Sequence, residues 1–218
     1  MKLKINRLQI SCDGGAATGK STGAKMIAKK YKLKFLSSGL LYRYAAYLIL
    51  KKRPINKIKL LKKEFKKLDY KKLEKISLHT QEISQTSAKI AKISYIRNIL
   101  KVFQTNFAKR FYNCCIEGRD ISTKILPKSD IKFFFICNLK DASSRRYKEL
   151  KKSDPNISLK DVKKALITRN ISDTRRKNSP LLKHRDSIVI DTGKMNKTTM
   201  VKKMSFYIDK ILKIKYGQ

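Results

Sequence analysis

Five short apolar runs, each ending in glycine or polar residues, recur along this chain. They are rich in Ile, Leu, Phe and Cys, and they span Leu8–Asp13, Lys34–Gly39, Tyr112–Asp120, Ile131–Leu139 and Ser187–Gly193. The fourth run is almost continuously apolar, which is typical of a strand buried on both faces of a sheet. Segments with helical periodicity fill the gaps, and this alternation favours a parallel sheet covered by helices. We therefore predict an α/β fold with three layers, α/β/α, around a five-stranded parallel sheet.

The helical segments are predicted from apolar positions spaced three or four residues apart. The stretch from Ala24 to Tyr31 has this spacing directly after the first run. Between residues 81 and 112 the apolar positions keep to one stripe, which predicts a long buried helix that is interrupted near Ser94. Three further segments are predicted helices: 40–52, 55–68 and 197–216.

The charge of the chain is extreme, with 54 Lys and Arg residues against 16 Asp and Glu in 218 residues, a net charge of +38. Such a surface attracts polyanions, so an RNA-binding ATPase is one hypothesis. The lysines, however, are spread from end to end, whereas a dedicated nucleic-acid face would be clustered and interleaved with aromatic residues. We therefore expect no specific nucleic-acid partner, although incidental binding stays open.

The composition also bounds the class of protein. Hydrophobic residues make up 41% of the chain, but no run of about 18 apolar residues occurs, so we expect no membrane span. The basic start is not followed by a long apolar stretch, and we expect no signal peptide. Four cysteines without a C-x-x-C pair and two histidines make a zinc site unlikely to form. The cysteines lie in apolar runs, as expected of buried thiols in a reducing cytoplasm.

A phosphate-binding motif follows the first apolar run. Gly14, Gly19, Lys20 and Ser21 fit G-x-x-x-x-G-K-[ST], and the motif opens a helical segment, which is the strand–loop–helix context it requires. Backbone N–H groups of such a loop surround the phosphates of a nucleoside triphosphate, the lysine spans the β- and γ-phosphates, and the serine hydroxyl is placed to bind Mg²⁺. The residues we predict to bind the triphosphate are Gly14, Gly15, Ala16, Ala17, Thr18, Gly19, Lys20, Ser21 and Thr22.

The acceptor of the phosphoryl group has to be found elsewhere in the chain. "NKTT" at 196–199 lacks the aspartate of the base-reading motif of common GTPases. A small kinase needs a second anion site rich in arginine, and the segment 168–180 supplies one. Arg169, Asp173 and Arg176 are four and three residues apart, so on a helix they would share one face. This arrangement fits either a surface ion pair or guanidinium groups that close over phosphate oxygens.

Polar residues at the ends of the predicted strands should meet at one rim of the sheet. The carboxyl ends of parallel strands form the binding edge of such folds. Ser37–Ser38, Glu117–Asp120 and Asp191 would join the phosphate-binding loop there. Asp13 and Glu117 could each orient Mg²⁺-bound water, or could instead be carboxylates that cap a loop; both readings stay open.

Five motifs in order resemble the bacterial cytidylate kinases, which are kinases of nucleoside monophosphates. They are "CDGGAATGKS" (12–21), "SSGLLYR" (37–43), "EGRDIST" (117–123), "RRYKEL" (145–150) and "RNISDTRRKNSPL" (169–181). The resemblance covers the chain from about Leu8 to Asp191. It implies a P-loop kinase fold with a lid and substrate-binding inserts, and it implies ATP with Mg²⁺ as cofactors.

The resemblance also implies the role of each site residue. Lys20 and Arg145 would contact ATP, and Ser21 would bind the metal. Lys20, Arg119, Arg169 and Arg176 would be catalytic. The acceptor nucleotide would be held by Ser38, Tyr42, Arg43, Arg97, Arg119, Asp120, Arg169, Asp173 and Arg176. Arg97, Asp120 and Ser38 would lie near the cytosine.

Four positions depart from the family pattern. Ser37 replaces an aspartate, His79 an arginine, Ala88 a serine that helps to read cytosine, and Asn170 an aspartate. Ser84 and Ser87 lie near Ala88. The insert between Arg43 and His79 is shorter than in well-known members and predicted to be helical. We expect His79 to be an ordinary histidine without a role in the site.

The predicted activity is ATP-dependent phosphorylation of CMP and dCMP by a monomeric cytoplasmic enzyme. Alternatives are another small acceptor such as UMP or AMP, or an ATPase that binds RNA. The single domain would comprise a core at 1–40, 107–140 and 184–218, a helical substrate-binding region at 41–106 and a lid at 141–183. Ser153–Asn156 and Pro180 would mark the lid hinges.

Overall fold

Five parallel strands form the centre of the computed structural model, which describes residues 6–152 and 154–217. Their order in the sheet is β2-β3-β1-β4-β5. The strands are β1 (Leu8–Gly14), β2 (Lys34–Ser37), β3 (Asn113–Gly118), β4 (Ile131–Ile136) and β5 (Ile188–Asp191). Every residue of β1 is buried, because this strand pairs with β3 on one side and β4 on the other. The predicted fold class is confirmed.

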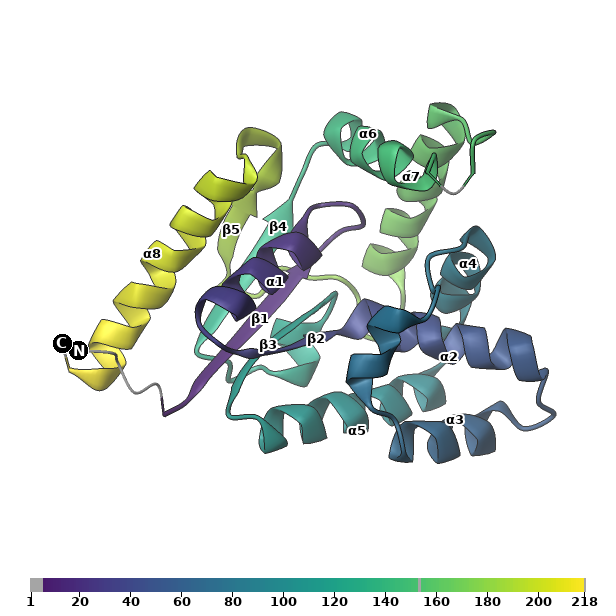
Figure 1. Cartoon of the computed structure of the whole chain (residues 1–218), viewed down its shortest axis with the longest axis horizontal. Helices are drawn as coiled ribbons and strands as arrows, with labels where there is room; N and C mark the ends of the chain where they lie inside the picture. Colours follow the sequence, from purple (N-terminus) through teal and green to yellow (C-terminus); the bar gives the residue numbers. More distant parts are fainter. Residues whose placement is uncertain (1–5, 153, 218) are drawn as a thin grey trace.

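The register of the sheet brings the predicted strand ends together. Cys12 of β1 lies opposite Glu117 of β3, and Glu117 lies opposite Ser37 of β2. Residues that follow these positions therefore leave the sheet at one rim. The chain between strands returns through helices, so each strand runs in the same direction (Figure 1).

One face of the sheet is covered by α1 (Lys20–Lys30) and α8 (Lys197–Tyr216). Ile27 of α1 and Met204 of α8 pack against Phe133 and Phe135 of β4 in one buried cluster. The predicted C-terminal helix coincides with α8. The phosphate-binding loop leads directly into the first of these helices, α1.

A larger group of helices shares a second buried cluster with β2 and β3. It includes α2 (Ser38–Lys52), α3 (Lys57–Lys66), η1 (Tyr70–Lys75), α4 (Gln81–Ile90), α5 (Ser94–Arg110) and η2 (Ile121–Ile125). Leu41, Leu61, Ile96 and Leu100 belong to its core. The predicted long helix is divided into α4 and α5, so the expected interruption near Ser94 is confirmed. The insert after Arg43 is helical, also as expected.

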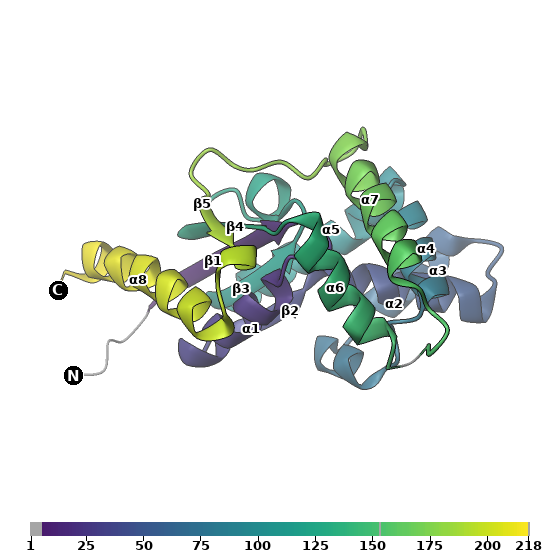
Figure 2. The same ribbon diagram turned by 90° about the horizontal axis from the view of Figure 1, so that it is seen from above.

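Two helices stand apart from the sheet. These are α6 (Leu139–Leu150) and α7 (Leu159–Arg175), which pack on each other through Ala142, Val162 and Leu166 (Figures 1 and 2). The remaining short helix is η3 (Thr192–Lys194), which follows β5 directly. Of the predicted hinge at 153–156, Ser153 lies outside the described residues.

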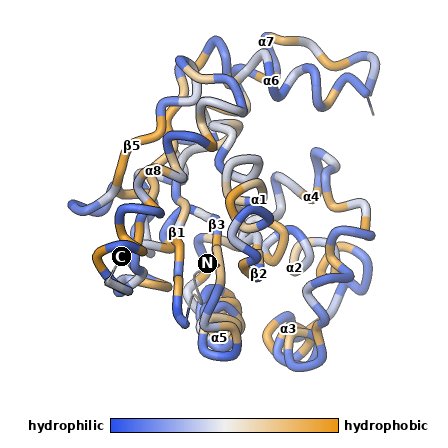
Figure 3. The backbone as a smooth tube through the Cα atoms, turned by 60° about the vertical axis from the view of Figure 1, so that its left-hand side comes forward, coloured by the Kyte–Doolittle hydropathy of each residue, from blue (hydrophilic) through white to orange (hydrophobic). Residues whose placement is uncertain are grey.

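Strands β2 and β4 are shorter than their apolar runs because helix caps end them. The second run was expected to reach Gly39, but the strand stops at Ser37, whose hydroxyl accepts a hydrogen bond from the Leu40 N–H and caps α2. The fourth run stops at Ile136, and Asn138 then caps α6. Hydrophilic and hydrophobic residues alternate along the helices around the sheet (Figure 3). Within the described ranges, no helix is long and apolar enough to cross a membrane.

Candidate active site

The loop between β1 and α1 is shaped by close backbone contacts. A Cβ atom placed on Gly14 would lie 2.5 Å from the carbonyl oxygen of Phe135, so only glycine fits there. Gly19 has a left-handed backbone with φ of 77°, and Ala17 has φ of 57°. These two turns fold the loop over the first turn of α1. Left-handed turns of this kind can aim successive backbone N–H groups at one point, which is the anion cradle that the sequence motif predicts.

The first turn of α1 is open to an anion. Its N-cap, Gly19, offers no side-chain hydrogen bond, and no acidic residue lies in the first turn. The orphan N–H groups and the positive end of the helix dipole are therefore left for a ligand. Thr18 is buried and closes the loop on itself, because its hydroxyl donates to the Gly15 carbonyl at 3.1 Å.

Lys20 lies inside this cradle. Its side chain is nearly buried, and its Nζ donates to the Gly15 carbonyl at 3.2 Å and lies 3.8 Å from Glu117 Oε2. Burial, together with the positive charge of Arg119, lowers the pKa of Lys20 to about 8, although Glu117 acts in the opposite direction. A cation that is so poorly compensated favours an incoming phosphate.

The two carboxylates at this rim have different tasks. Glu117 contacts Lys20 and accepts a hydrogen bond from the Ser37 hydroxyl. Asp13 accepts from the Ile121 and Ser122 N–H groups at 2.8 and 2.7 Å, and from the Ser122 hydroxyl at 2.6 Å. Burial raises the pKa of Asp13, while these bonds oppose the rise. Both oxygens of Asp13 are thus used to hold η2, which favours the loop-capping reading over a role at a metal.

The oxygen donors near the loop fit a hard cation such as Mg²⁺. Ser21 is the second residue of α1 and is exposed, so its hydroxyl is not enclosed by the protein. Magnesium usually keeps several waters and uses few protein ligands when a substrate supplies phosphate oxygens. Among residues 6–152 and 154–217, no group of three His, Cys, Asp or Glu side chains could hold a metal by itself. A metal here would therefore depend on Ser21 and on the bound nucleotide.

Three arginines converge on Asp173. Arg119 Nε donates to Asp173 Oδ2 at 2.8 Å, Arg169 Nε lies 3.2 Å from the same oxygen, and Arg176 Nη1 lies 3.7 Å from Oδ1. Burial acts to raise the pKa of Asp173, but Arg119 and Arg169 outweigh it and hold the pKa at about 2. The sequence predicts that Arg169, Asp173 and Arg176 share one helix face. This prediction was wrong for Arg176, because α7 ends at Arg175 and the backbone of Arg176 is extended at the C-cap. Arg176 reaches Asp173 from the chain that leaves the helix.

A second buried ion pair lies beside this group. Arg97 of α5 donates to Asp120 Oδ2 and to the Ala91 carbonyl, and its guanidinium lies over the ring of Tyr42. Arg176 Nη2 lies 3.9 Å from Asp120 Oδ1, and although buried it makes no hydrogen bond to any of the described residues. A buried guanidinium nitrogen without a partner is costly, so this atom is available to a ligand.

Arg43 has a partner that sequence reasoning did not assign to the site. Its Nη1 lies 2.6 Å from Nδ1 of His79, and Glu149 of α6 lies 4.0 Å from the same histidine nitrogen. Burial and the charge of Arg43 lower the pKa of His79, which keeps the ring neutral and able to accept. His79 is exposed, as an ordinary histidine would be, but it contacts Arg43, one of the predicted acceptor-binding residues. The only signal in the sequence was its place in the family pattern.

The separate helices α6 and α7 contact the phosphate-binding loop directly. Arg145 donates to the hydroxyl and the carbonyl of Thr192 at 2.9 and 2.7 Å, and the Thr192 hydroxyl donates to the Thr18 carbonyl at 2.8 Å. Asn170 Oδ1 accepts from the Ala16 N–H at 3.1 Å. Thr192 was not predicted, because a lone threonine after a strand carries no signal.

Two predicted residues play smaller parts in this arrangement. Asp191 was expected at the rim, but it accepts from its own neighbour, the Gly193 N–H, at 3.1 Å. Thr22 is exposed on α1 beyond the cradle. The Ser84 carbonyl accepts from Arg169 at 3.2 Å, and the Ser87 hydroxyl donates to the same carbonyl at 2.8 Å, so both serines near Ala88 lie by the arginine cluster.

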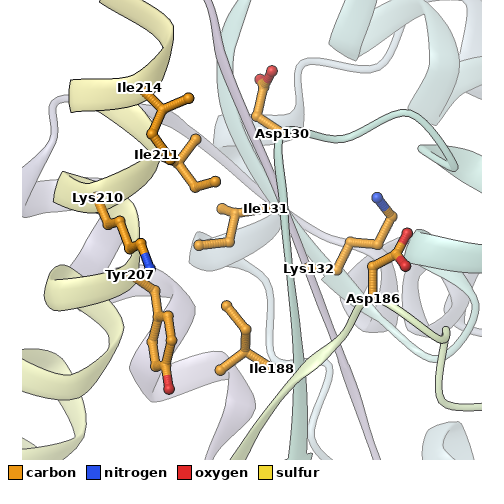
Figure 4. Close-up of a pocket in the computed structure, with 9 residues that line it drawn as sticks. All are labelled: Asp130, Ile131, Lys132, Asp186, Ile188, Tyr207, Lys210, Ile211 and Ile214. Atoms are coloured by element: carbon orange, nitrogen blue, oxygen red, sulfur yellow. The ribbon is translucent and has the colours of Figure 1, made fainter.

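Two hollows lie away from this rim. One, of about 370 Å³, lies at the amino ends of β4 and β5 against α8 (Figure 4), and its lining includes Asp130 and Lys132. Asp130 is already paired with the Gln9 N–H and with Lys215. The other, of about 690 Å³, is an apolar groove between α3 and α5. Neither contains the phosphate-binding loop, and the chemistry gathers at the strand ends instead.

Comparison with known proteins gives a consistent result. The family model described as cytidylate kinase matches residues 10–210. A cytidylate kinase of Bartonella quintana is 34% identical over 205 residues, covering 94% of this chain and 95% of the relative. One of Rickettsia africae is 34% identical over 203 residues, covering 91% and 90%.

Solved structures of low sequence identity share the fold. An uncharacterized protein of Eubacterium ventriosum has a TM-score of 0.56 at 15% identity and covers 94% of this chain and 99% of its own. A shikimate kinase of Bacteroides thetaiotaomicron has a TM-score of 0.51 at 10% identity, covering 93% and 98%. The loop, the arginine cluster around Asp173 and the match along nearly the whole chain agree, and the chain belongs to the cytidylate kinase family.

Proposed function

We propose that this protein transfers the γ-phosphoryl group of ATP to CMP and dCMP. The observation that carries the proposal is that two anion grips, the cradle with Lys20 and the arginine cluster around Asp173, lie next to each other at one rim of the sheet. Lys20 lies in the cradle, close enough to Arg119 for the charge of Arg119 to lower its pKa. Arg119 is also one of the three arginines that contact Asp173. Two phosphates held by these grips would lie side by side.

The cradle is the proposed ATP site. N–H groups from Gly14 to Ser21 would surround the β-phosphate, and Lys20 would span the β- and γ-phosphates. Lys20 would exchange the Gly15 carbonyl for phosphate oxygens, a gain because a carbonyl compensates its charge poorly. Arg145, anchored on Thr192 beside the loop, would contact ATP from the α6 side. When bound, Mg²⁺ neutralises phosphate charge, and Ser21 would hold it together with water.

The arginines are the proposed site of the acceptor phosphate and ribose. Tyr42, Arg43 and Arg119 would hold the phosphate, while Arg169 and Asp173 would face the ribose and phosphates. Arg176 would use its Nη2, which makes no hydrogen bond to any of the described residues, for the acceptor. The acceptor is a phosphate anion at neutral pH, so the reaction needs no general base. Lys20 and the arginines would instead position the two phosphates and stabilise charge on the transferred group.

The buried pair of Arg97 and Asp120 is the proposed reader of cytosine, with Ser38 nearby. Cytosine presents an amino donor at N4 and acceptors at N3 and O2. An arginine can donate to the acceptors while a carboxylate accepts from the amino group. Uracil has an acceptor at position 4, which would face the carboxylate and leave it unpaired, so UMP is disfavoured.

The proposed division of the chain into a lid, a substrate-binding region and a core follows the arrangement of the helices. We propose residues 141–183 as a lid, 41–106 as the substrate-binding region, and the remainder as the core, with Pro180 near one hinge. Closure would exclude water that otherwise hydrolyses ATP. The proposed enzyme is monomeric and acts in the cytoplasm, where its buried thiols stay reduced.

A coupled assay of ADP formation over CMP, dCMP, UMP and AMP tests the proposal. CMP and dCMP should give the highest kcat/KM. Equal rates with UMP or AMP would remove the cytosine assignment but keep the kinase. ATP turnover that RNA stimulates and CMP does not, with steep salt dependence, would favour the RNA-binding ATPase instead.

A further inference from the structure

One buried glutamine lies beside the proposed acceptor site without a role so far. Gln104 of α5 is 1% exposed. Its Nε2 donates to the Ser38 hydroxyl at 3.3 Å, and its Oε1 is buried without a hydrogen bond to any of the described residues. An unpaired buried amide oxygen is costly, and an apolar residue of the same size would avoid this cost. Its presence therefore points to a role for the amide group, whose nitrogen contacts Ser38.

The position of Gln104 on α5 places it in line with the proposed base reader. The buried residues of this helix are apolar except for Arg97 and Gln104, which are seven residues, or about two helical turns, apart and so lie on one side. Arg97 reaches Asp120, and Gln104 reaches Ser38. The polar stripe of α5 thus supports two residues that belong to the proposed acceptor site.

The chemistry of the Ser38 hydroxyl makes this contact directional. A serine hydroxyl has one hydrogen and can accept as well as donate. Because the Gln104 amide donates to its oxygen, the hydroxyl hydrogen of Ser38 stays free to point elsewhere. Ser38 packs against Gly118, where an added Cβ would lie 3.1 Å from the Ser38 Cβ, and Gly118 directly precedes Arg119. The free hydrogen is therefore close to the anion grip.

We propose that Gln104 is a positioning residue that keeps Ser38 a hydrogen-bond donor toward the acceptor nucleotide. Gln104 itself acts through Ser38. The inference rests on the proposed function, because it needs a nucleoside monophosphate in the arginine site. It deepens that function by assigning a supporting residue to one of the substrate contacts.

A double-mutant cycle on initial rates tests the inference. Ser38→Ala should raise the KM for CMP up to about 10-fold, the loss expected for one hydrogen bond to the nucleotide. Gln104→Met should raise it by about 3- to 10-fold with the KM for ATP unchanged. In the Ser38→Ala background, Gln104→Met should change the KM for CMP less than about 2-fold, because its target is gone. Equal fold-changes in both backgrounds would overturn the inference.

A chemically opposite variant provides a second test. Gln104→Glu places an acceptor-only carboxylate beside Ser38, which captures the hydroxyl hydrogen. The KM for CMP should rise at least as much as in Gln104→Met, and a wild-type KM would contradict the inference. If Gln104→Met fails to fold, Gln104→Asn replaces it, since its amide is one carbon too short to reach Ser38.

The matched control is another buried glutamine. Gln9, near the start of β1 and so at the opposite end of this strand from the phosphate-binding loop, donates to the Ala108 carbonyl at 3.0 Å. Gln9→Met should lower the midpoint of thermal unfolding and leave both KM values unchanged. A wild-type enzyme without CMP-dependent ADP formation would refute the proposed acceptor rather than Gln104. The cycle would then be run with the monophosphate that is phosphorylated.

Discussion

Arg119 and Asp173 are joined by a 2.8 Å hydrogen bond that ties the end of β3 to α7. One residue comes from the rigid sheet, and the other from a helix that packs mainly on α6. The pair is nearly buried, with side-chain exposures of 17% and 4%. The position of the proposed lid is therefore set by the same arginine that we expect to hold the acceptor phosphate.

Arg119→Lys should reduce kcat/KM for CMP about 10- to 100-fold while the fold stays intact. Lysine keeps the charge but cannot contact Asp173 and a phosphate through separate nitrogens of one planar group. The coupled ADP assay and a thermal unfolding curve measure the two effects. Arg185→Lys, at a side chain that is 91% exposed, is the control. An Arg119→Lys enzyme with normal kinetics would exclude the proposed grip.

ATP binding at pH 8 should take up about half a proton, because Lys20 has a pKa of about 8 and must be charged beside the phosphates. The KM for ATP should accordingly rise as the pH increases above about 8, where neutral Lys20 predominates. Calorimetry in two buffers of different ionisation enthalpy gives the proton count. Lys20→Arg stays protonated and should bind ATP without uptake. Uptake that persists in this variant would assign the proton to another group.

Asp120→Asn should narrow the preference for CMP over UMP at least about 10-fold, because an amide can donate to the oxygen of uracil. The ratio of the two kcat/KM values measures this. Asp69→Asn, at the exposed cap of η1, should leave the ratio unchanged since asparagine caps equally well. An unchanged ratio in Asp120→Asn would place the base elsewhere.

Acidification should weaken the fold through Asp173. The pKa of this carboxyl is about 2 in the folded protein, against about 3.9 when unfolded. A depressed pKa stabilises the fold above the unfolded value, and this contribution is lost as the pH falls from about 4 toward 2. The loss amounts to roughly 2–3 kcal/mol. Urea unfolding at several pH values should show it, and Asp173→Asn, which cannot titrate, should show a correspondingly flatter dependence.

Gly14→Ala should destabilise the fold by about 1–3 kcal/mol, because the added carbon would overlap the Phe135 carbonyl. Denaturant unfolding measures the change. Gly39→Ala is the matched control, because its nearest atom would lie at 3.6 Å and alanine favours the helix by up to about 1 kcal/mol. Similar losses in both variants would argue against the close contact as the cause.

The sheet was predictable because its signals are local. An apolar run such as Ile131–Ile136 and a glycine motif such as Gly14–Ser21 carry their meaning within a few residues. Parallel pairing then follows from the alternation of strands and helices. The strand ends were less accurate because capping side chains such as Ser37 decide where a helix begins, and they compete with an apolar pattern that continues.

The partners within the site were not predictable in the same way. Arg43 and His79 are 36 residues apart, and Arg145 and Thr192 are 47 apart, so no spacing along the chain relates them. Which arginines matter could be inferred, since lysine is the common cation here. Which residues these arginines contact depends on how α2, α6 and η3 pack, and this packing is a property of the folded molecule.

The interruption between α4 and α5 also has a consequence for recognition. Because the first helix stops at Ile90, the Ala91 carbonyl is not occupied by a later backbone amide of one continuous helix, and it receives the Arg97 guanidinium at 3.1 Å. In one continuous helix a backbone amide would have donated to that oxygen, and the Arg97 side chain would have been free to rotate. Because Arg97 is a proposed reader of the base, the preference for CMP over UMP depends on where α4 ends. Related proteins could therefore change this preference by shifting the end of a helix, without replacing any residue that contacts the base.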